Sequence, residues 1–281
     1  MAELSERARQ VRKSIMDHTR GEGVVPTTAQ LCRELGLSPE DLAADLLNLE
    51  AAASVARQDS AHAGLTRFQD ETLDEPLPPL GEIMYARPFA AFENHYPVWA
   101  DGEQKWFAEC AVEACSISAQ FPGKEVTVRS VCRQTREPVE LVGRDGVLVD
   151  YSPATLRVHL GYPLRTLPAR IVGWCDYNSF FASEDAARQW ASLHPEVHGV
   201  TRSPETMSRL IGELFGKGRL DYDYQPAVPI LDAVLHMKRY GLDKPTALGF
   251  RVPDPFFLPS PGMVRDWKRQ GYPNYFRFSL R

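Results

Sequence analysis

The first sixty residues have the spacing of apolar positions that is typical of helices. Apolar side chains recur every three or four residues over residues 4–19 and again, after a Gly/Pro break, up to about residue 52. Thr27 or Thr28 can cap the second helix, and Ser38 can cap the third. This order predicts a helix-turn-helix inside a winged-helix-like domain over residues 1–60.

The pattern changes after an acidic, proline-bearing linker over residues 61–82. From residue 83 to about residue 201, short alternating strands are separated by two helices. The first helix is expected over residues 104–119 with Trp106 and Cys110 on its inward stripe, and Ser183 is expected to cap the second. The expected strands cover residues 124–132, 147–151, 156–160 and 197–201, and residues 85–99 are strand-like.

The strand–helix–strand order occurs twice within residues 83–201, which predicts an α/β (α+β) core of two β/α repeats with one of the cysteines discussed below in each. Residues 202–281 contain many prolines and aromatic residues, with possible helices at 204–215 and 230–240. We expect this segment to be an irregular C-terminal extension that wraps around the core.

Charge excludes several classes of function. The net charge is −5, which argues against general electrostatic binding of nucleic acid or of an anionic membrane. The candidate recognition helix, residues 39–52, contains four acidic residues and no basic one, so we do not expect it to bind DNA. No apolar run is long enough to span a membrane, and the N-terminus lacks the apolar segment of a signal peptide, so a cytoplasmic protein with reduced cysteines is expected.

Two distant cysteines carry the candidate chemistry. Cys110 lies in the segment WFAECAVEACS, and Cys175 lies in GWCDYNSFFAS. Glu113 follows Cys110 by three residues, which on a helix places it one turn away on the same face. Two thiolates can hold a soft metal while a carboxylic acid delivers a proton to a group bonded to that metal. The spacing alone does not show that the three side chains meet.

Three segments resemble the alkylmercury (organomercurial) lyases. The run Cys110-Ala111-Val112-Glu113 is similar to a Cys-Ala-Leu-Asp element of that family, and Cys132 stands at the distance of a downstream family cysteine. The segment around Cys175, with its Phe-Phe-Ala-Ser turn and Ala-x-x-Trp-Ala helix, is similar to the part that holds the second active-site cysteine. Two departures affect substrate and rate: Glu113 replaces the usual Asp, and Asp176 stands where some members have another cysteine.

The resemblance implies a lyase that cleaves carbon–mercury bonds in mercury detoxification and resistance. Cys110 and Cys175 would bind the mercury of the substrate, and Glu113 would carry a proton from a thiol to carbon. Asp176, Trp106 and Trp174 are secondary candidates, the tryptophans as part of an apolar wall with Phe180 and Phe181. No cofactor is implied. Cellular thiols would release the mercuric ion, with a mercuric reductase as a candidate recipient.

Other interpretations stay open at this point. The same thiols could hold copper or mercury without cleaving anything, or the fold could act on another small molecule, or the helices could serve a metal-responsive regulator. Glu113 could be held in an ion pair, for example with Arg129 or Arg170. Cys32, Cys115 and Cys132 are expected to be structural, because a buried cysteine is commonly a small core residue.

Overall fold

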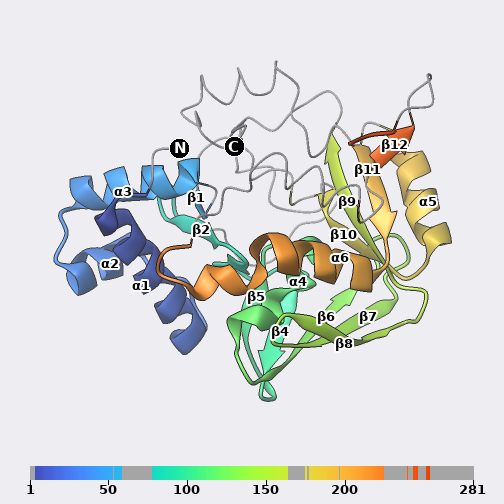
Figure 1. Ribbon diagram of the computed structural model, residues 1–281, viewed down its shortest axis with the longest axis horizontal. Coiled ribbons are helices and arrows are strands. Elements are labelled where there is room, and N and C mark those ends of the chain that lie inside the picture. The colour runs from blue at the N-terminus through green and yellow to red at the C-terminus, as the bar shows by residue number, and fades with distance from the viewer. Residues whose placement is uncertain are drawn as a thin grey trace.

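Three parts of the molecule lie beside one another: a helical N-terminal unit, a large antiparallel sheet, and a small sheet covered by a helix (Figure 1). The computed structural model describes residues 4–52, 54–58, 78–163, 175, 177–195, 197–224, 239, 243–245 and 251–253. The mixed helix and strand content confirms the fold class expected from the sequence.

The N-terminal unit consists of α1 (Glu6–Glu22), α2 (Thr28–Leu35) and α3 (Pro39–Ala51). The Thr27 side chain caps α2, and the Ser38 hydroxyl accepts the backbone N–H of Asp41 at the start of α3. Such caps satisfy donors that the first turn of a helix leaves unpaired. The apolar faces pack into one cluster, formed mainly by Leu4, Ala8, Val11, Ile15, Leu31, Leu42, Leu46, Leu49, Val55, Ile83 and Ala86. The predicted helical unit is therefore confirmed.

The large sheet is antiparallel and has eight strands in the order β1-β2-β3-β5-β4-β6-β7-β8. Because β1 pairs with β2, the helical unit and the core share one sheet. The strands are β1 (Val55–Arg57), β2 (Ile83–Ala86), β3 (Phe89–Ala90), β4 (Pro97–Ala100), β5 (Glu103–Ala108), β6 (Glu125–Val131), β7 (Pro138–Arg144) and β8 (Val147–Ser152).

The long helix expected over residues 104–119 is wrong. Its first part is strand β5, which pairs with both β3 and β4, and only α4 (Ala111–Ala114) and the 3-10 turn η1 (Ile117–Gln120) are helical. Trp106 and Ala108 are buried on alternate positions of β5, so the apolar spacing there has the period of a strand. Pairing on both sides overrides the local helical pattern.

The small sheet has the order β10-β9-β11 and is formed by β9 (Arg157–Pro163), β10 (Ser179–Phe181) and β11 (Val197–Arg202). Helix α5 (Glu184–Leu193) packs on it and is capped by Ser183, as expected. Helix α6 (Pro204–Ile211) follows, then a π-helical turn η3 (Gly212–Gly216) and a 3-10 turn η4 (Lys217–Leu220). This segment runs from the small sheet back to α1 (Figure 1).

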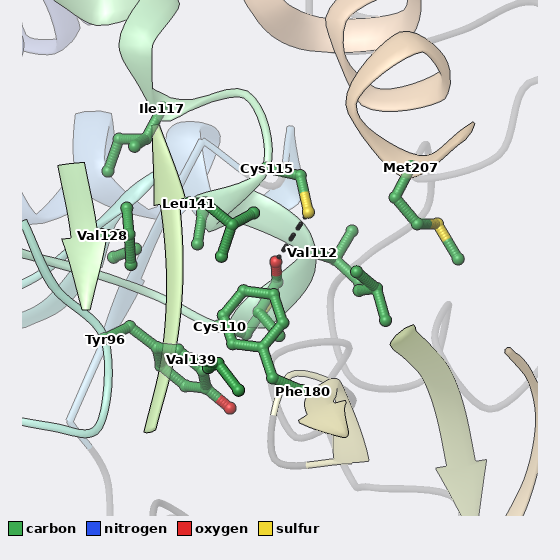
Figure 2. Close-up of a cluster of buried hydrophobic side chains, with 14 of the residues drawn as sticks. Tyr96, Cys110, Val112, Cys115, Ile117, Val128, Val139, Leu141, Phe180 and Met207 are labelled. Carbon is green, nitrogen blue, oxygen red and sulfur yellow. Dashed lines mark hydrogen bonds between the residues drawn. The ribbon is translucent and has the colours of Figure 1, made fainter. Parts of the chain in front are cut away.

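One apolar core joins the two sheets. Side chains from β4, β5, β6, α4, β10 and α6 belong to a single buried cluster, part of which Figure 2 shows. Farther along, β12 (Asp243–Pro245) and β13 (Arg251–Pro253) form a two-stranded sheet. The helix expected at 230–240 and most of the linker at 61–82 lie outside the described residues. No helix in the described ranges is long and apolar enough to cross a membrane.

Candidate active site

Cys110 lies where the large sheet ends and α4 begins. Strand β5 stops at Ala108, the Glu109 N–H donates to the Pro88 carbonyl, and the Cys110 carbonyl accepts the N–H of Ala114 in the first turn of α4. Cys110 is 1% exposed and belongs to the apolar cluster that also contains Tyr96 and Phe180 (Figure 2). The short strand-to-helix turn therefore fixes this thiol inside the core.

Asn178 connects the segment of Cys175 to Cys110. Its backbone N–H donates to the Cys175 carbonyl at 3.1 Å, and its side-chain amide approaches the Cys110 sulfur at 3.5 Å. The same amide accepts the N–H of Gly161 in the small sheet, and the Tyr96 hydroxyl donates to its backbone carbonyl at 3.0 Å. This network holds the two cysteine-bearing segments together.

The structure brings the two predicted thiols close together, since Cys175 packs against the buried cluster that contains Cys110. A hydrogen bond with Cys110, burial, and the nearby charges of Cys110 and Glu109 raise the pKa of Cys175 well above its ordinary value, while Arg87 opposes them. The Cys175 thiol donates to Oε1 of Glu109 at 3.1 Å. Two sulfurs and a carboxyl group thus share one buried location.

Glu109 is a site residue that the sequence reasoning missed. Its side chain has no exposed surface, and Nε of Arg87 contacts its two oxygens at 3.2 and 2.9 Å. Burial raises the pKa of Glu109 against the opposing charge of Arg87, and the charge of Glu113 raises it further. A buried acid directly before Cys110 was the available signal. The expected helix instead directed attention to the residue one turn away.

Glu113 has different surroundings. Both of its oxygens accept hydrogen bonds from the guanidinium of Arg219, at 2.5 and 2.8 Å. Burial acts to raise the pKa of Glu113, but the charge and hydrogen bonds of Arg219, together with the charge of Arg87, bring it below its ordinary value. The ion pair considered from the sequence is therefore present with a third arginine, since Arg129 pairs with Glu140 and Arg170 lies outside the described residues. The role of Glu113 as the acid stays a prediction.

Of the secondary candidates, the structure describes Trp106 and the two phenylalanines. The indole N–H of Trp106 donates to the Thr19 carbonyl of α1 at 2.7 Å, which makes this side chain a link between the helical unit and the sheet. Trp174 and Asp176 lie outside the described residues. Phe180 packs edge-on against Tyr96 in the cluster of Cys110, whereas Phe181 packs against His159 and Trp190.

The other cysteines have the surroundings of packing residues. Cys115 is buried and its thiol approaches the Ala111 carbonyl at 3.2 Å; burial raises its pKa. Cys132 is fully buried, and Cys32 packs at the edge of the N-terminal cluster. The described residues contain no group of three or more His, Cys, Asp or Glu side chains arranged to hold a metal ion.

A cavity of about 520 Å³ lies elsewhere, between the start of β8 and the α6–η3 segment. Leu148, Glu205, Arg209 and Tyr224 are among its lining residues, and neither Cys110 nor Cys175 is one of them. The site of the two thiols is therefore separate from this cavity.

Comparisons with known proteins agree with the resemblance in the sequence. The family model for alkylmercury lyase (MerB) matches residues 89–216, the segment that contains Glu109, Cys110, Glu113 and Cys175. An alkylmercury lyase of Bacillus cereus is 30% identical over 128 residues, or 45% of this chain and 56% of the relative. An alkylmercury lyase of Streptomyces lividans is 32% identical over 103 residues, 36% of this chain and 45% of the relative. The chain thus spans about half the length of these relatives.

The fold has a likeness among solved structures. The crystal structure of the mercury-bound form of MerB2 superimposes with a TM-score of 0.56 and 20% sequence identity, over 78% of this chain and 94% of the other. At that identity the likeness concerns the fold. The resemblance to the alkylmercury lyases is therefore confirmed in sequence for residues 89–216 and in fold over a larger part of the chain.

Proposed function

We propose that this protein is an organomercurial lyase, which cleaves a carbon–mercury bond by adding a proton to carbon. The observation that carries the proposal is the contact between Cys110 and Cys175 beside a buried carboxyl group, within the segment similar to the alkylmercury lyases. The products are a hydrocarbon and mercuric ion, and a small thiol from the cell acts as co-reactant in removing the ion.

The chemistry needs both thiols. A carbon–mercury bond is nearly nonpolar, and thiolates are the softest and most electron-rich ligands that the protein offers to mercury. The first thiolate displaces the thiol that accompanies the substrate, and the second raises the electron density on carbon. A carboxylic acid then protonates that carbon, because a free carbanion is too unstable to leave in water.

The surroundings of Cys110 support binding of an organic group. The thiol belongs to the apolar cluster of Tyr96, Val139 and Phe180 (Figure 2). An apolar wall with a few polar groups is the usual composition of a small-molecule site. Excluding water there also strengthens the interaction between the acid and the developing negative charge on carbon.

The test is the release of methane from methylmercury chloride in the presence of excess small thiol. We expect the wild-type protein to release methane and Cys110→Ser and Cys175→Ser each to lower the rate at least about a thousandfold, since each removes one sulfur ligand. Cys32→Ser is the matched control, because Cys32 lies in the N-terminal unit, and it should keep the wild-type rate. A folded wild-type protein that binds methylmercury without releasing methane would contradict the proposal.

One observation favours a second candidate, a protein that holds a soft metal ion without catalysis. Glu113, which the motif resemblance matches to the family's acid, accepts hydrogen bonds from Arg219 with both oxygens. On this alternative, mercuric or cuprous ion binds with one equivalent per chain and Cys110→Ser abolishes binding, while no methane appears. The methane measurement therefore separates the two functions.

A further inference from the structure

The structure places one glutamate at each end of α4, Glu109 fully buried and Glu113 partly buried, and they differ in what they contact. Glu109 accepts a hydrogen bond from the Cys175 thiol at 3.1 Å. Glu113 contacts Arg219 through both oxygens, and no hydrogen bond to a thiol is recorded for it among the described residues. Proton transfer requires a donor and an acceptor within hydrogen-bond distance, so the two carboxyl groups are not equivalent.

We propose that Glu109, and not Glu113, accepts the proton of Cys175 and then transfers it to the carbon of the substrate. This inference rests on the proposed lyase function and names the acid of that reaction. It departs from the sequence resemblance, which matches Glu113 to the family's acid. Arg87 is a positioning residue that keeps the Glu109 carboxyl group directed at the thiols.

The sequence of steps balances without another reactant. The Cys110 thiol displaces the accompanying thiol of the organomercurial, forming one sulfur–mercury bond and releasing that thiol with the Cys110 proton. Cys175 then bonds to mercury while its proton moves to the Glu109 carboxylate. The carbon–mercury bond breaks with both electrons on carbon, and carbon takes the proton from Glu109. A hydrocarbon leaves, mercuric ion stays on two thiolates, and Glu109 is again a carboxylate.

Burial and charge support Glu109 in this role. A carboxylate has room for about four hydrogen bonds, so the contacts with Arg87 leave acceptor capacity for the thiol. Its side chain has no exposed surface, and burial favours the neutral acid once the thiol proton arrives. Because the Glu109 carboxyl group is shielded from water, its proton does not exchange with solvent before the carbon–mercury bond breaks.

Glu113 is less suited to hold a proton. Protonation of Glu113 would break its bidentate ion pair with Arg219 and leave the buried Arg219 guanidinium without a counter-charge. We assign Glu113 to fixing α4, and therefore Cys110, against η4.

The kinetic test compares Glu109→Gln with Glu113→Gln, the same isosteric change four residues apart. Each variant is first checked for a cooperative unfolding transition and for binding of mercuric ion. We expect Glu109→Gln to lower kcat for methane release by about 100-fold to 10,000-fold, the usual contribution of a general acid, with little change in KM. Glu113→Gln should lower it by less than about tenfold. Retention of the wild-type rate by Glu109→Gln would overturn the assignment.

An infrared measurement tests the proton transfer without turnover. In Cys110→Ser, methylmercury chloride added without small thiol can bond at this site to Cys175 alone. Chloride leaves as the anion, so the Cys175 proton moves to a carboxylate of the site and the reaction stops there. The assignment predicts a carboxylic-acid C=O band when methylmercury binds. The band should persist in Cys110→Ser with Glu113→Gln and vanish in Cys110→Ser with Glu109→Gln. A band that vanishes in the Glu113→Gln double variant and persists in the Glu109→Gln double variant would overturn the assignment of Glu109.

The two experiments separate this inference from the proposed function. If the wild-type protein releases no methane, the lyase function fails, and the infrared band still reports whether Glu109 takes the proton. If methane is released and the band does not depend on Glu109, the lyase function stands and the assignment of Glu109 fails. If both glutamine variants lose cleavage, the band decides which carboxyl group receives the proton.

Discussion

The two ends of α4 present the same chemical group in opposite electrostatic settings. At its N-terminal end, Glu109 has no exposed surface and meets Arg87 through one nitrogen, and burial raises its pKa. At its C-terminal end, Glu113 meets Arg219 through two nitrogens, and its pKa is lowered. Each glutamate has an arginine partner, and Glu113 is the less buried of the two. The number and direction of the hydrogen bonds decide which one can carry a proton.

The comparison shows why an aligned residue type does not by itself assign a role. A fork of two parallel hydrogen bonds is stronger and more directional than a contact through one nitrogen. Arg219 therefore holds Glu113 as a carboxylate, while Arg87 orients Glu109 and leaves it able to accept the Cys175 proton. The surroundings, built from distant parts of the chain, separate the two groups.

The largest expected effect comes from removing the arginine of the stronger pair. Arg219→Met should lower the free energy of unfolding by about 3–5 kcal/mol, because it leaves the Glu113 carboxylate buried without a partner. Arg87→Met should cost less, because Glu109 can become neutral by binding a proton. Urea unfolding at neutral pH measures both.

Arg129→Met is the control for these substitutions. Its pair with Glu140 is well exposed, so the free energy of unfolding should change little. Equal losses for Arg87→Met and Arg219→Met would remove the distinction between the two ends of α4.

A smaller effect is expected in the pH dependence of stability, with opposite signs for the two glutamates. The pKa of Glu113 is lower in the folded protein than in the unfolded chain, where it is about 4.5. The ion pair with Arg219 therefore stabilises the protein fully above the unfolded-state pKa, and this contribution is lost as the pH falls through the folded-state pKa. The raised pKa of Glu109 means that its contribution is present below the unfolded pKa and is lost as pH rises through the folded pKa.

Urea unfolding of the wild type and of each glutamine variant, from about pH 7 down to about pH 4, measures these trends. The advantage of the wild type over Glu113→Gln should shrink as pH falls. Relative to Glu109→Gln, the wild type should gain stability over the same range. Two slopes of the same sign would contradict the assigned pKa directions.

The smallest expected effect is on the reactivity of the Cys175 thiol. Glu109→Gln removes a negative charge that raises the pKa of Cys175 and leaves Arg87, which lowers it. Alkylation by iodoacetamide, followed by mass spectrometry of the peptide containing Cys175, should then be several-fold faster at neutral pH. Glu113→Gln provides the comparison. An unchanged rate in Glu109→Gln would indicate that the carboxyl group does not control this thiol.

Local signals in the sequence predict much of the fold. The capping residues Thr27, Ser38 and Ser183 correctly begin three helices, because a cap depends on neighbours within one turn. Alternation correctly predicts β6 and β8. Residues 104–108 were predicted wrongly, because their strand depends on pairing with β3 and β4, which sequence spacing alone does not reveal.

The candidate site was predictable in part. Motifs around Cys110 and Cys175 selected the two thiols that the structure brings into contact. Glu109 was missed, because its importance depends on a hydrogen bond to a residue 66 positions away in the sequence. Arg219 was missed for the same reason, since it contacts Glu113 across 106 positions. Contacts of this length leave no spacing pattern in the chain.

The docking of α1 affects the order in which this protein can be completed on the ribosome. Arg12 of α1 donates to the backbone carbonyls of Arg219 and Asp221, and the Tyr222 hydroxyl donates to Glu6. The nascent helix emerges first, but the segment that it holds is synthesised some two hundred residues later. Until that segment arrives, Glu113 lacks its counter-charge. Helix α1 is therefore synthesised about two hundred residues before the segment whose Arg219 pairs with α4.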